Sequence, residues 1–143
     1  PLIFFIPGHA FLGFWLTDSY YNDFQEEVIR DLGSKLVGKY LNAREWSRDQ
    51  KYAELLMRVL RSEEYRRHLF SKYKNRIADG HIIPLNSTTF TTDGSFEKCK
   101  EAAFAYIFGD TTHVPPIPPQ PIHAVVDIQA IRSRIKQMQL EHD

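Results

Sequence analysis

The sequence predicts an α+β fold: a small, mostly antiparallel sheet with flanking helices and an insert of three helices. Strand-like apolar runs lie near both ends of the chain, while apolar residues in the middle recur at the three- and four-residue steps of helices. The 143 residues are 43% hydrophobic and 25% charged, which is typical of a globular domain. We therefore expect one domain over residues 1–143, with a sheet-containing core formed by 1–17 and 81–143 and a helical insert formed by 18–80.

Two apolar strands open the chain. Leu2–Ile6 and Ala10–Leu16 are rich in Phe, Ile and Leu, and Pro7 and Gly8 provide a turn between them. Both runs are almost continuously apolar, which is typical of strands covered on both faces. Because a strand of this kind begins at the second residue, we expect these residues to be a piece of a longer polypeptide.

The middle of the chain predicts three helices. Ser62 is a candidate N-cap for the third helix, since Glu63 and Glu64 follow it, and Gly80 is a candidate C-terminal stop. The apolar positions that define the three helices are Phe24, Val28, Ile29, Leu32, Leu36, Val37, Tyr40 and Leu41; Tyr52, Leu55, Leu56, Val59 and Leu60; and Tyr65, Leu69, Tyr73 and Ile77.

A strand and a helix follow the insert. The segment His81–Asn86 predicts a short strand, and Pro84 favours an edge position or a bulge because it has no N–H to donate to a neighbouring strand. The loop STTFTTDG then leads to Ser95, a candidate N-cap for a helix over residues 96–108, and Gly109 ends that helix.

The C-terminal end of the chain predicts one more strand and one more helix. The proline-rich segment DTTHVPPIPPQP is typical of a stiff, extended linker, and His123–Ile128 predicts the last strand. Asp127 is a candidate N-cap for a final helix, whose apolar stripe consists of Ile128, Ile131, Ile135 and Met138.

Composition excludes several classes of function. Lys and Arg total 18, as do Asp and Glu, so the net charge does not indicate nucleic acid or a membrane surface as a partner. The longest apolar stretch, residues 2–16, is too short and too interrupted to span a bilayer. One cysteine excludes an internal disulfide and is typical of a reducing, cytoplasmic setting. Neither metal-ligand spacing nor a glycine-rich phosphate loop occurs, so we expect no metal and no cofactor.

His9 and Asn86 are the candidate site residues. His9 follows the Pro7-Gly8 turn at the start of a strand, where a neutral imidazole acts as a general base or remains a core histidine that is hydrogen-bonded. Asn86 ends another strand, where its amide orients an imidazole or closes an Asx turn. A shared site requires the His9 ring and the Asn86 side chain to lie within hydrogen-bond reach.

Two further features have alternative interpretations. Cys99 lies on the apolar stripe of the helix over 96–108, so a buried, inert thiol is favoured over a reactive one. A basic stretch interleaved with aromatic residues either faces a phosphate backbone or forms a solvated helix face. The solvated face is the favoured interpretation; in the alternative, the cations that would contact nucleic acid are Arg58, Arg61, Arg66, Arg67, Lys72 and Lys74.

Three blocks of the chain resemble a known family. In order, PGHAFLGFWL, IIPLNSTTFTTDGSFEKCKEAA and HAVVDIQAIRSRIK resemble the transglutaminase-like, papain-fold domains of large bacterial proteins that also carry helicase and nuclease modules. The resemblance implies the C-terminal portion of that fold. It implies that His9 is the family's histidine and that Asn86 stands where the family usually has an acid. The family's nucleophilic cysteine would lie on a helix before the first strand, and Cys99 does not match it.

The resemblance therefore implies a cysteine hydrolase or acyltransferase domain. His9 would act as base and then as acid, Asn86 would orient it, and an upstream segment of the same polypeptide would supply the cysteine. The 143 residues alone are then expected to be inactive. The alternative is a non-catalytic interaction module of a larger multidomain protein, which contacts nucleic acid through residues 58–76.

Overall fold

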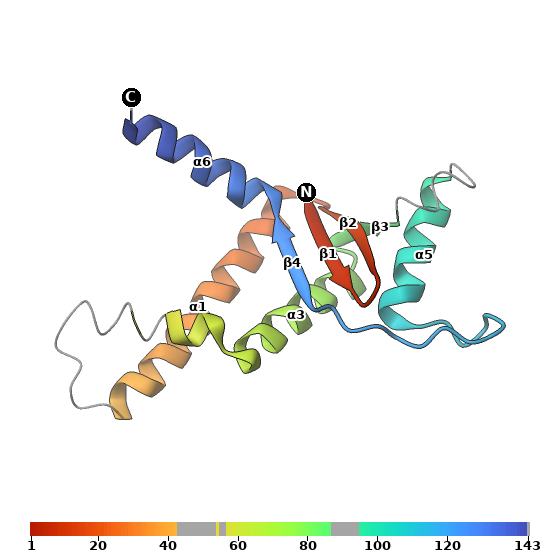
Figure 1. Cartoon of the computed structure of the whole chain (residues 1–143), viewed down its shortest axis with the longest axis horizontal. Coiled ribbons are helices and arrows are strands. Elements are labelled where there is room, and N and C mark those ends of the chain that lie inside the picture. The colour runs from red at the N-terminus through yellow and green to blue at the C-terminus, as the bar shows by residue number, and fades with distance from the viewer. Residues whose placement is uncertain (43–53, 55–56, 87–94, 143) are drawn as a thin grey trace. The chain divides into compact units, whose positions relative to one another are not determined.

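The computed structural model confirms the α+β fold (Figure 1). It describes residues 1–42, 54, 57–86 and 95–142. Several predicted positions lie outside the described residues: Tyr52, Leu55, Leu56 and the STTFTTDG loop, together with the side chains of Leu36, Val37, Tyr40 and Leu41. The chain divides into two compact units, one made of Pro1–Leu16 and Tyr73–Asp143 and the other of Thr17–Lys72.

The first unit is built on a four-stranded sheet. Its strand order is β3-β2-β1-β4, and every neighbouring pair is antiparallel. The strands are β1 (Leu2–Ile6), β2 (His9–Trp15), β3 (Ile82–Leu85) and β4 (Ala124–Asp127). Pro84 lies on β3 at the edge of the sheet, as its missing N–H predicts.

One face of this sheet, here called the inner face, carries the core of the first unit. Phe4 lies opposite Phe11, and their rings stack with centroids 5.3 Å apart. Tyr73 meets the Phe4 ring edge-on at 5.8 Å. The buried side chains of the inner face are Leu2, Phe4, Ile6, Phe11, Ile82, Pro84 and Asn86. Alternation along β1 and β3 therefore places every second residue of these strands in the core.

The opposite face, here called the outer face, is less covered than the sequence predicts. Phe14 is 41% exposed, so the prediction of strands covered on both faces is wrong there. The other apolar residues of the outer face are only half-buried: Ile3, Phe5, Ala10, Leu12, Ile83, Leu85, Ala124 and Val126. A continuous apolar run indicates that both faces are suited to burial, but it does not show whether each of them is covered.

Helix α5 (Phe96–Phe108) packs against β3. The Ser95 hydroxyl accepts a hydrogen bond from the backbone N–H of Lys98, which confirms the predicted N-cap. At the other end, Gly109 has φ 79°, and its N–H donates to the Ala105 carbonyl. The buried side of the helix consists of Cys99, Ala103 and Ile107.

Helix α3 (Glu63–Ala78) has the predicted boundaries. The Ser62 hydroxyl accepts from the backbone N–H of Tyr65 at 3.2 Å. Gly80, with φ 78°, donates its N–H to the Ile77 carbonyl, and the next N–H, of His81, donates to the Arg76 carbonyl. These two bonds form a Schellman motif, which satisfies carbonyls at the helix end and leads the chain into β3.

The second unit contains α1 (Asp18–Asn42), helical residues 57–61 and the part of α3 up to Lys72. Its core includes the buried side chains of Val59 and Tyr65, with Leu32 and Leu69 packed against them. Unpredicted from the sequence, the hydroxyl of Thr17 caps α1 by accepting from the backbone N–H of Tyr20 at 3.1 Å.

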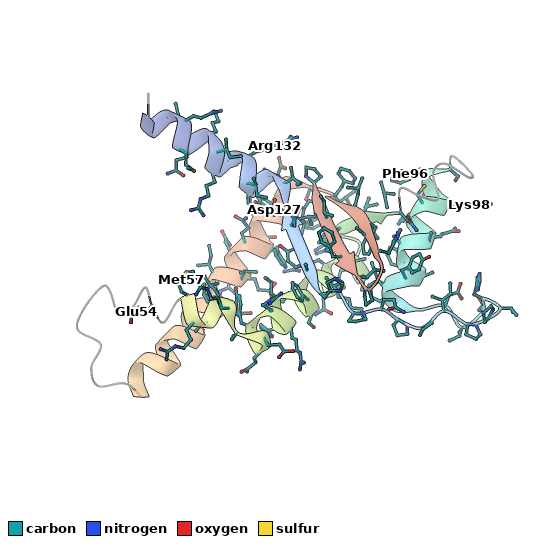
Figure 2. The ribbon with its side chains drawn as sticks, in the orientation of Figure 1. Glu54, Met57, Phe96, Lys98, Asp127 and Arg132 are labelled. Carbon is teal, nitrogen blue, oxygen red and sulfur yellow. The ribbon has the colours of Figure 1, made fainter. Side chains whose placement is uncertain are left out.

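Helix α6 (Ile128–His142) follows β4 without an intervening residue. The Asp127 carboxylate accepts from the backbone N–H of Ala130 at 3.1 Å, which confirms the predicted cap; Asp127 and Arg132 mark this junction in Figure 2. The predicted apolar stripe is exposed for most of its length, at 47% for Ile131, 51% for Ile135 and 49% for Met138. Within the described ranges, no helix combines the length and the hydropathy that a membrane span needs.

A substitution of Gly13 tests the packing of the inner face. A Cβ at Gly13 would lie 2.3 Å from the Cε2 atom of Phe4, so Gly13→Ala forces the ring out of its stack. We expect a loss of about 1–3 kcal/mol in the free energy of unfolding, measured by urea denaturation.

Gly33→Ala is the matched control for that substitution. Gly33 lies within α1, and nothing stands within 4 Å of its Cβ position. Since alanine is a better helix former than glycine by about 1 kcal/mol, this variant should keep or raise stability. Equal losses in the two variants would contradict the packing argument.

Candidate functional site

The structure brings His9 and Asn86 together. The Nε2 atom of His9 lies 3.1 Å from the Oδ1 atom of Asn86, although the residues are 77 positions apart in the sequence. The required hydrogen bond between these two side chains is thus confirmed. Asn86 is 3% exposed and His9 is half-buried, so the bond is partly screened from water.

The pairing of β2 with β3 accounts for this contact. Leu12 pairs with Leu85 and Gly13 with Pro84, so the next residue of the β3 segment, Asn86, comes beside Phe11. Residues that lie opposite each other across an antiparallel pair share a face, and so do residues two apart on one strand. Asn86 and His9 therefore project from the inner face as diagonal neighbours.

Helix α5 holds both residues from the side. The backbone N–H of Asn86 donates to the carbonyl of Cys99 at 3.0 Å, in the first turns of the helix. Two turns later, the ring of Tyr106 lies against the His9 ring, with centroids 5.3 Å apart and planes inclined by 30°. The helix therefore holds the backbone of Asn86 through the Cys99 carbonyl and contacts the His9 imidazole through the Tyr106 ring.

Tyr106 is the site residue that sequence reasoning missed. Its place on the apolar stripe of α5 indicates packing, yet it is 37% exposed and stacks on His9. The available signal was its seven-residue spacing from Cys99, which puts both residues on one side of the helix. That spacing does not identify the neighbour of the ring, because the neighbour depends on how α5 is rotated against β3.

The hydrogen bond assigns the two nitrogens of the His9 ring. The Asn86 Oδ1 atom is an acceptor, so the Nε2–H group of His9 donates to it. In the neutral ring the Nδ1 atom then carries the lone pair. An imidazole held in this tautomer can accept a proton at Nδ1 while its orientation is fixed at Nε2.

Cys99 has a structural role in this arrangement. Its side chain is 2% exposed, which confirms the predicted burial, and its carbonyl anchors Asn86. It is also the chain's one cysteine, so these residues contain no exposed thiol. The pair of His9 and Asn86 therefore has an orienting group and a base, but no nucleophile from this chain.

Some cations of the predicted basic surface contact side chains within the chain itself. Lys72, whose side chain is 13% exposed, contacts the carboxylates of Glu27 and Asp31. Arg67 pairs with Glu63 at 2.7 Å. The ammonium of Lys74 lies 5.7 Å from the centre of the Phe108 ring.

The side chains of Arg58, Arg61 and Arg66 are exposed. Contact with nucleic acid remains a prediction, and these contacts reduce the charge that Lys72 offers to it.

The Lys72 contacts form an ion cluster between α1 and α3 within the second unit. The hydrogen bond from Lys72 to Asp31 is the main reason why the pKa of Asp31 falls below its ordinary value of 3.8. His68, whose Nε2 atom lies 3.4 Å from Asp31 Oδ2, adds to this effect. Burial opposes the charge of Lys72, but its hydrogen bonds to Asp31 and Glu27 outweigh burial and raise its pKa above 10.5.

Comparisons with known proteins found no similar protein. No protein-family model, curated protein or solved structure matches the chain. In the part of the chain that the structure describes, no three His, Cys, Asp or Glu side chains are grouped as a metal site requires. The geometry of His9, Asn86 and Tyr106 is therefore what supports a functional hypothesis.

Nitrogen NMR of the histidine rings tests the candidate site. We expect His9 to be in the Nε2–H tautomer in its neutral form, and Asn86→Ala to remove that preference because it removes the acceptor. His113 is an internal control, since its Nδ1 atom lies 2.8 Å from the Pro115 carbonyl and must donate to it. A His9 tautomer that is unchanged in Asn86→Ala would contradict the assignment.

The ion cluster predicts a pH dependence of stability. A carboxylate whose pKa is lowered by folding stabilises the fold above its ordinary value of 3.8, and this contribution is lost as the pH falls through the lowered value. We expect Asp31→Asn to lower the melting temperature near about pH 6, and the difference from the unsubstituted chain to shrink as the pH falls below 3.8. Thermal denaturation followed by circular dichroism measures both.

Glu63→Gln is the matched control for Asp31→Asn. Glu63 also pairs with a cation of α3, but both side chains of that pair are 78% exposed. An exposed pair contributes little, because water screens it and two flexible side chains must be ordered. A pH-independent effect of Asp31→Asn, or an equal effect of Glu63→Gln, would contradict the cluster's role.

Proposed function

We propose that this chain supplies the histidine and amide of a cysteine-dependent acyl-transfer site, as in the transglutaminase-like, papain-fold domains that it resembles. The observation that carries the proposal is the hydrogen bond from His9 Nε2 to Asn86 Oδ1, at 3.1 Å. The bond leaves Nδ1 of the neutral ring as the base, and the burial of Asn86 protects the orienting contact from water. Its substrates are amides or esters with an electrophilic carbonyl carbon.

The reaction proceeds through a thioester. The thiol of the nucleophile gives its proton to Nδ1 of His9, and the thiolate attacks the carbonyl carbon, so that a carbon–sulfur bond forms. The imidazolium then passes the proton to the leaving nitrogen or oxygen as its bond to carbon breaks. Water or an amine attacks the thioester and gives a proton to His9, which returns it to the departing sulfur. Protons balance over the cycle, and no redox step occurs.

Asn86 determines how strongly this site stabilises the charged form of the imidazole. An amide orients the imidazole as a carboxylate does, but it carries no charge and stabilises the imidazolium less. The Asn86 side chain holds the ring at Nε2 throughout the cycle, since that nitrogen keeps its proton in both the neutral and the charged form. Tyr106 restricts the ring from one side, which makes it a positioning residue rather than a reacting one.

The nucleophile comes from outside these 143 residues. Cys99 does not serve, because its thiol is buried. We therefore propose a cysteine on another segment of the same polypeptide. The second candidate is a non-catalytic interaction module that kept this fold. The amide at position 86 and the lack of an exposed thiol in the chain favour it.

The test uses the natural full-length polypeptide and an electrophile that reacts with thiolates, such as iodoacetamide. We expect one exposed cysteine outside the 143 residues to be alkylated quickly, with the labelled site found by mass spectrometry. In His9→Ala the alkylation rate at neutral pH should fall by about tenfold, because a cysteine without its base is a thiolate only to a few per cent at that pH. Asn86→Ala should give a smaller loss in the same direction.

His113→Ala is the control, because His113 is an exposed histidine bonded within its own loop. It should leave the alkylation rate unchanged. If no cysteine reacts faster than a free thiol, or if His9→Ala reacts as fast as the unsubstituted protein, the catalytic proposal is wrong. The second candidate, the interaction module, then stands.

A further inference from the structure

A proline-rich segment connects α5 to β4 within the first unit. Residues 115–121 have the sequence PPIPPQP, so five of the seven are prolines, and all five are exposed. The two residues between them, Ile117 and Gln120, are half-buried. In Figure 1 the segment belongs to the blue trace that leaves the end of α5 and returns to β4. Residues 115–121 are here called the proline ridge.

The sequence of the proline ridge favours the polyproline II conformation. A proline ring fixes φ at about −65°, and a residue that precedes a proline is restricted to extended values of ψ. Four ridge residues precede a proline, namely Pro115, Ile117, Pro118 and Gln120. Because polyproline II has φ of about −75° and ψ of about +145°, both restrictions favour it. The ridge therefore needs little further ordering to adopt this conformation.

Backbone hydrogen bonds hold one side of the proline ridge. The N–H groups at every third position donate to carbonyls of the first unit at 2.8–2.9 Å: Ile117 to Asp110, Gln120 to Tyr106, and His123, just beyond the ridge, to Phe5. Ile117 also accepts a bond from Asp110 at its carbonyl. Since polyproline II has three residues per turn, positions three apart lie on one side of it. The ridge is therefore anchored along a single side.

The other two sides of the ridge consist of prolines. One row contains Pro115, Pro118 and Pro121, and the other contains Pro116 and Pro119. Their exposure agrees with a period of three residues, because the anchored row alone is half-buried. Prolines have no N–H group, so these rows cannot pair with a strand of another protein. What they present to a partner is apolar rings and carbonyl acceptors.

We infer that the proline ridge is the docking site of a partner domain whose groove is lined by aromatic side chains, as in SH3 and WW domains. Such grooves bind polyproline II segments with prolines three positions apart, and a segment that is already ordered loses little entropy on binding. Their aromatic rings pack on proline rings, while Trp N–H and Tyr O–H groups donate to carbonyls. The ridge has the required spacing three times, at 115 and 118, 116 and 119, and 118 and 121. This inference does not depend on the proposed catalytic function.

Calorimetric titration of the 143-residue chain with a panel of SH3 and WW domains tests the inference. We expect at least one domain of the panel to bind the chain with one-to-one stoichiometry. The double variant Pro118→Ala, Pro121→Ala should bind that domain at least about tenfold more weakly, because it removes two rings of one row. Circular dichroism checks that the variant is folded.

Pro7→Ala is the matched control. Pro7 is also an exposed proline of the first unit, but it lies in the turn between β1 and β2, away from the ridge. Its variant should bind as the unsubstituted chain does. If the double variant fails to fold, amide NMR of the unsubstituted chain replaces it: the signals of Ile117 and Gln120 should shift when the domain is added, whereas that of Gly33 in α1 should not.

A synthetic peptide of residues 113–123 separates the chemistry of the ridge from its presentation by the fold. The chain should bind at least as tightly as the peptide, because its anchored ridge is already ordered. Three outcomes would overturn the inference: no domain of the panel binds, a domain binds the peptide but not the chain, or the double variant binds as tightly as the unsubstituted chain. The second outcome would show that the ridge is covered in the folded chain, and the third that its prolines only stiffen a connection.

Discussion

The register of β2 against β3 is the constraint on which the rest of the first unit depends. A slip of one residue would turn Asn86 to the outer face and leave His9 without its partner, since side chains alternate between the faces of a sheet. Bonds on both sides of the pairing hold it in place. The N–H of Leu16 donates to the His81 carbonyl at 2.9 Å, and the N–H of Asn86 donates to the Cys99 carbonyl at 3.0 Å.

The same constraint extends into the helices. The Schellman motif at Gly80 ends α3 at a defined residue, so the chain enters β3 in one register. The Ser95 cap and Gly109 limit α5 in a similar way, and its Cys99 and Tyr106 then reach Asn86 and His9. A side chain held by capped helices and a paired strand loses little further freedom on binding a substrate, which is the basis of preorganisation.

The sequence predicted those parts of the site that depend on local signals. Pro7-Gly8 and Pro84 marked where strands begin or must lie at an edge, and from these His9 and Asn86 could be placed at strand ends. It did not predict Tyr106, because the neighbour of that ring depends on the rotation of a whole helix. Nor did it predict that Lys72 would pair with Glu27, 45 positions away, since its neighbours in sequence indicated only a basic face.

Strand β2 carries the candidate site on one face and an apolar surface on the other. His9 projects from its inner face, whereas Phe14 projects from its outer face, because the two residues differ by an odd number of positions. A partner packed on Phe14 therefore cannot block the imidazole directly. It would instead bury the opposite side of the strand that carries His9, and a strand covered on both faces opens less often than one with a face exposed to water. Association on the outer face would then hold the geometry of the inner face more firmly without contributing any reacting group.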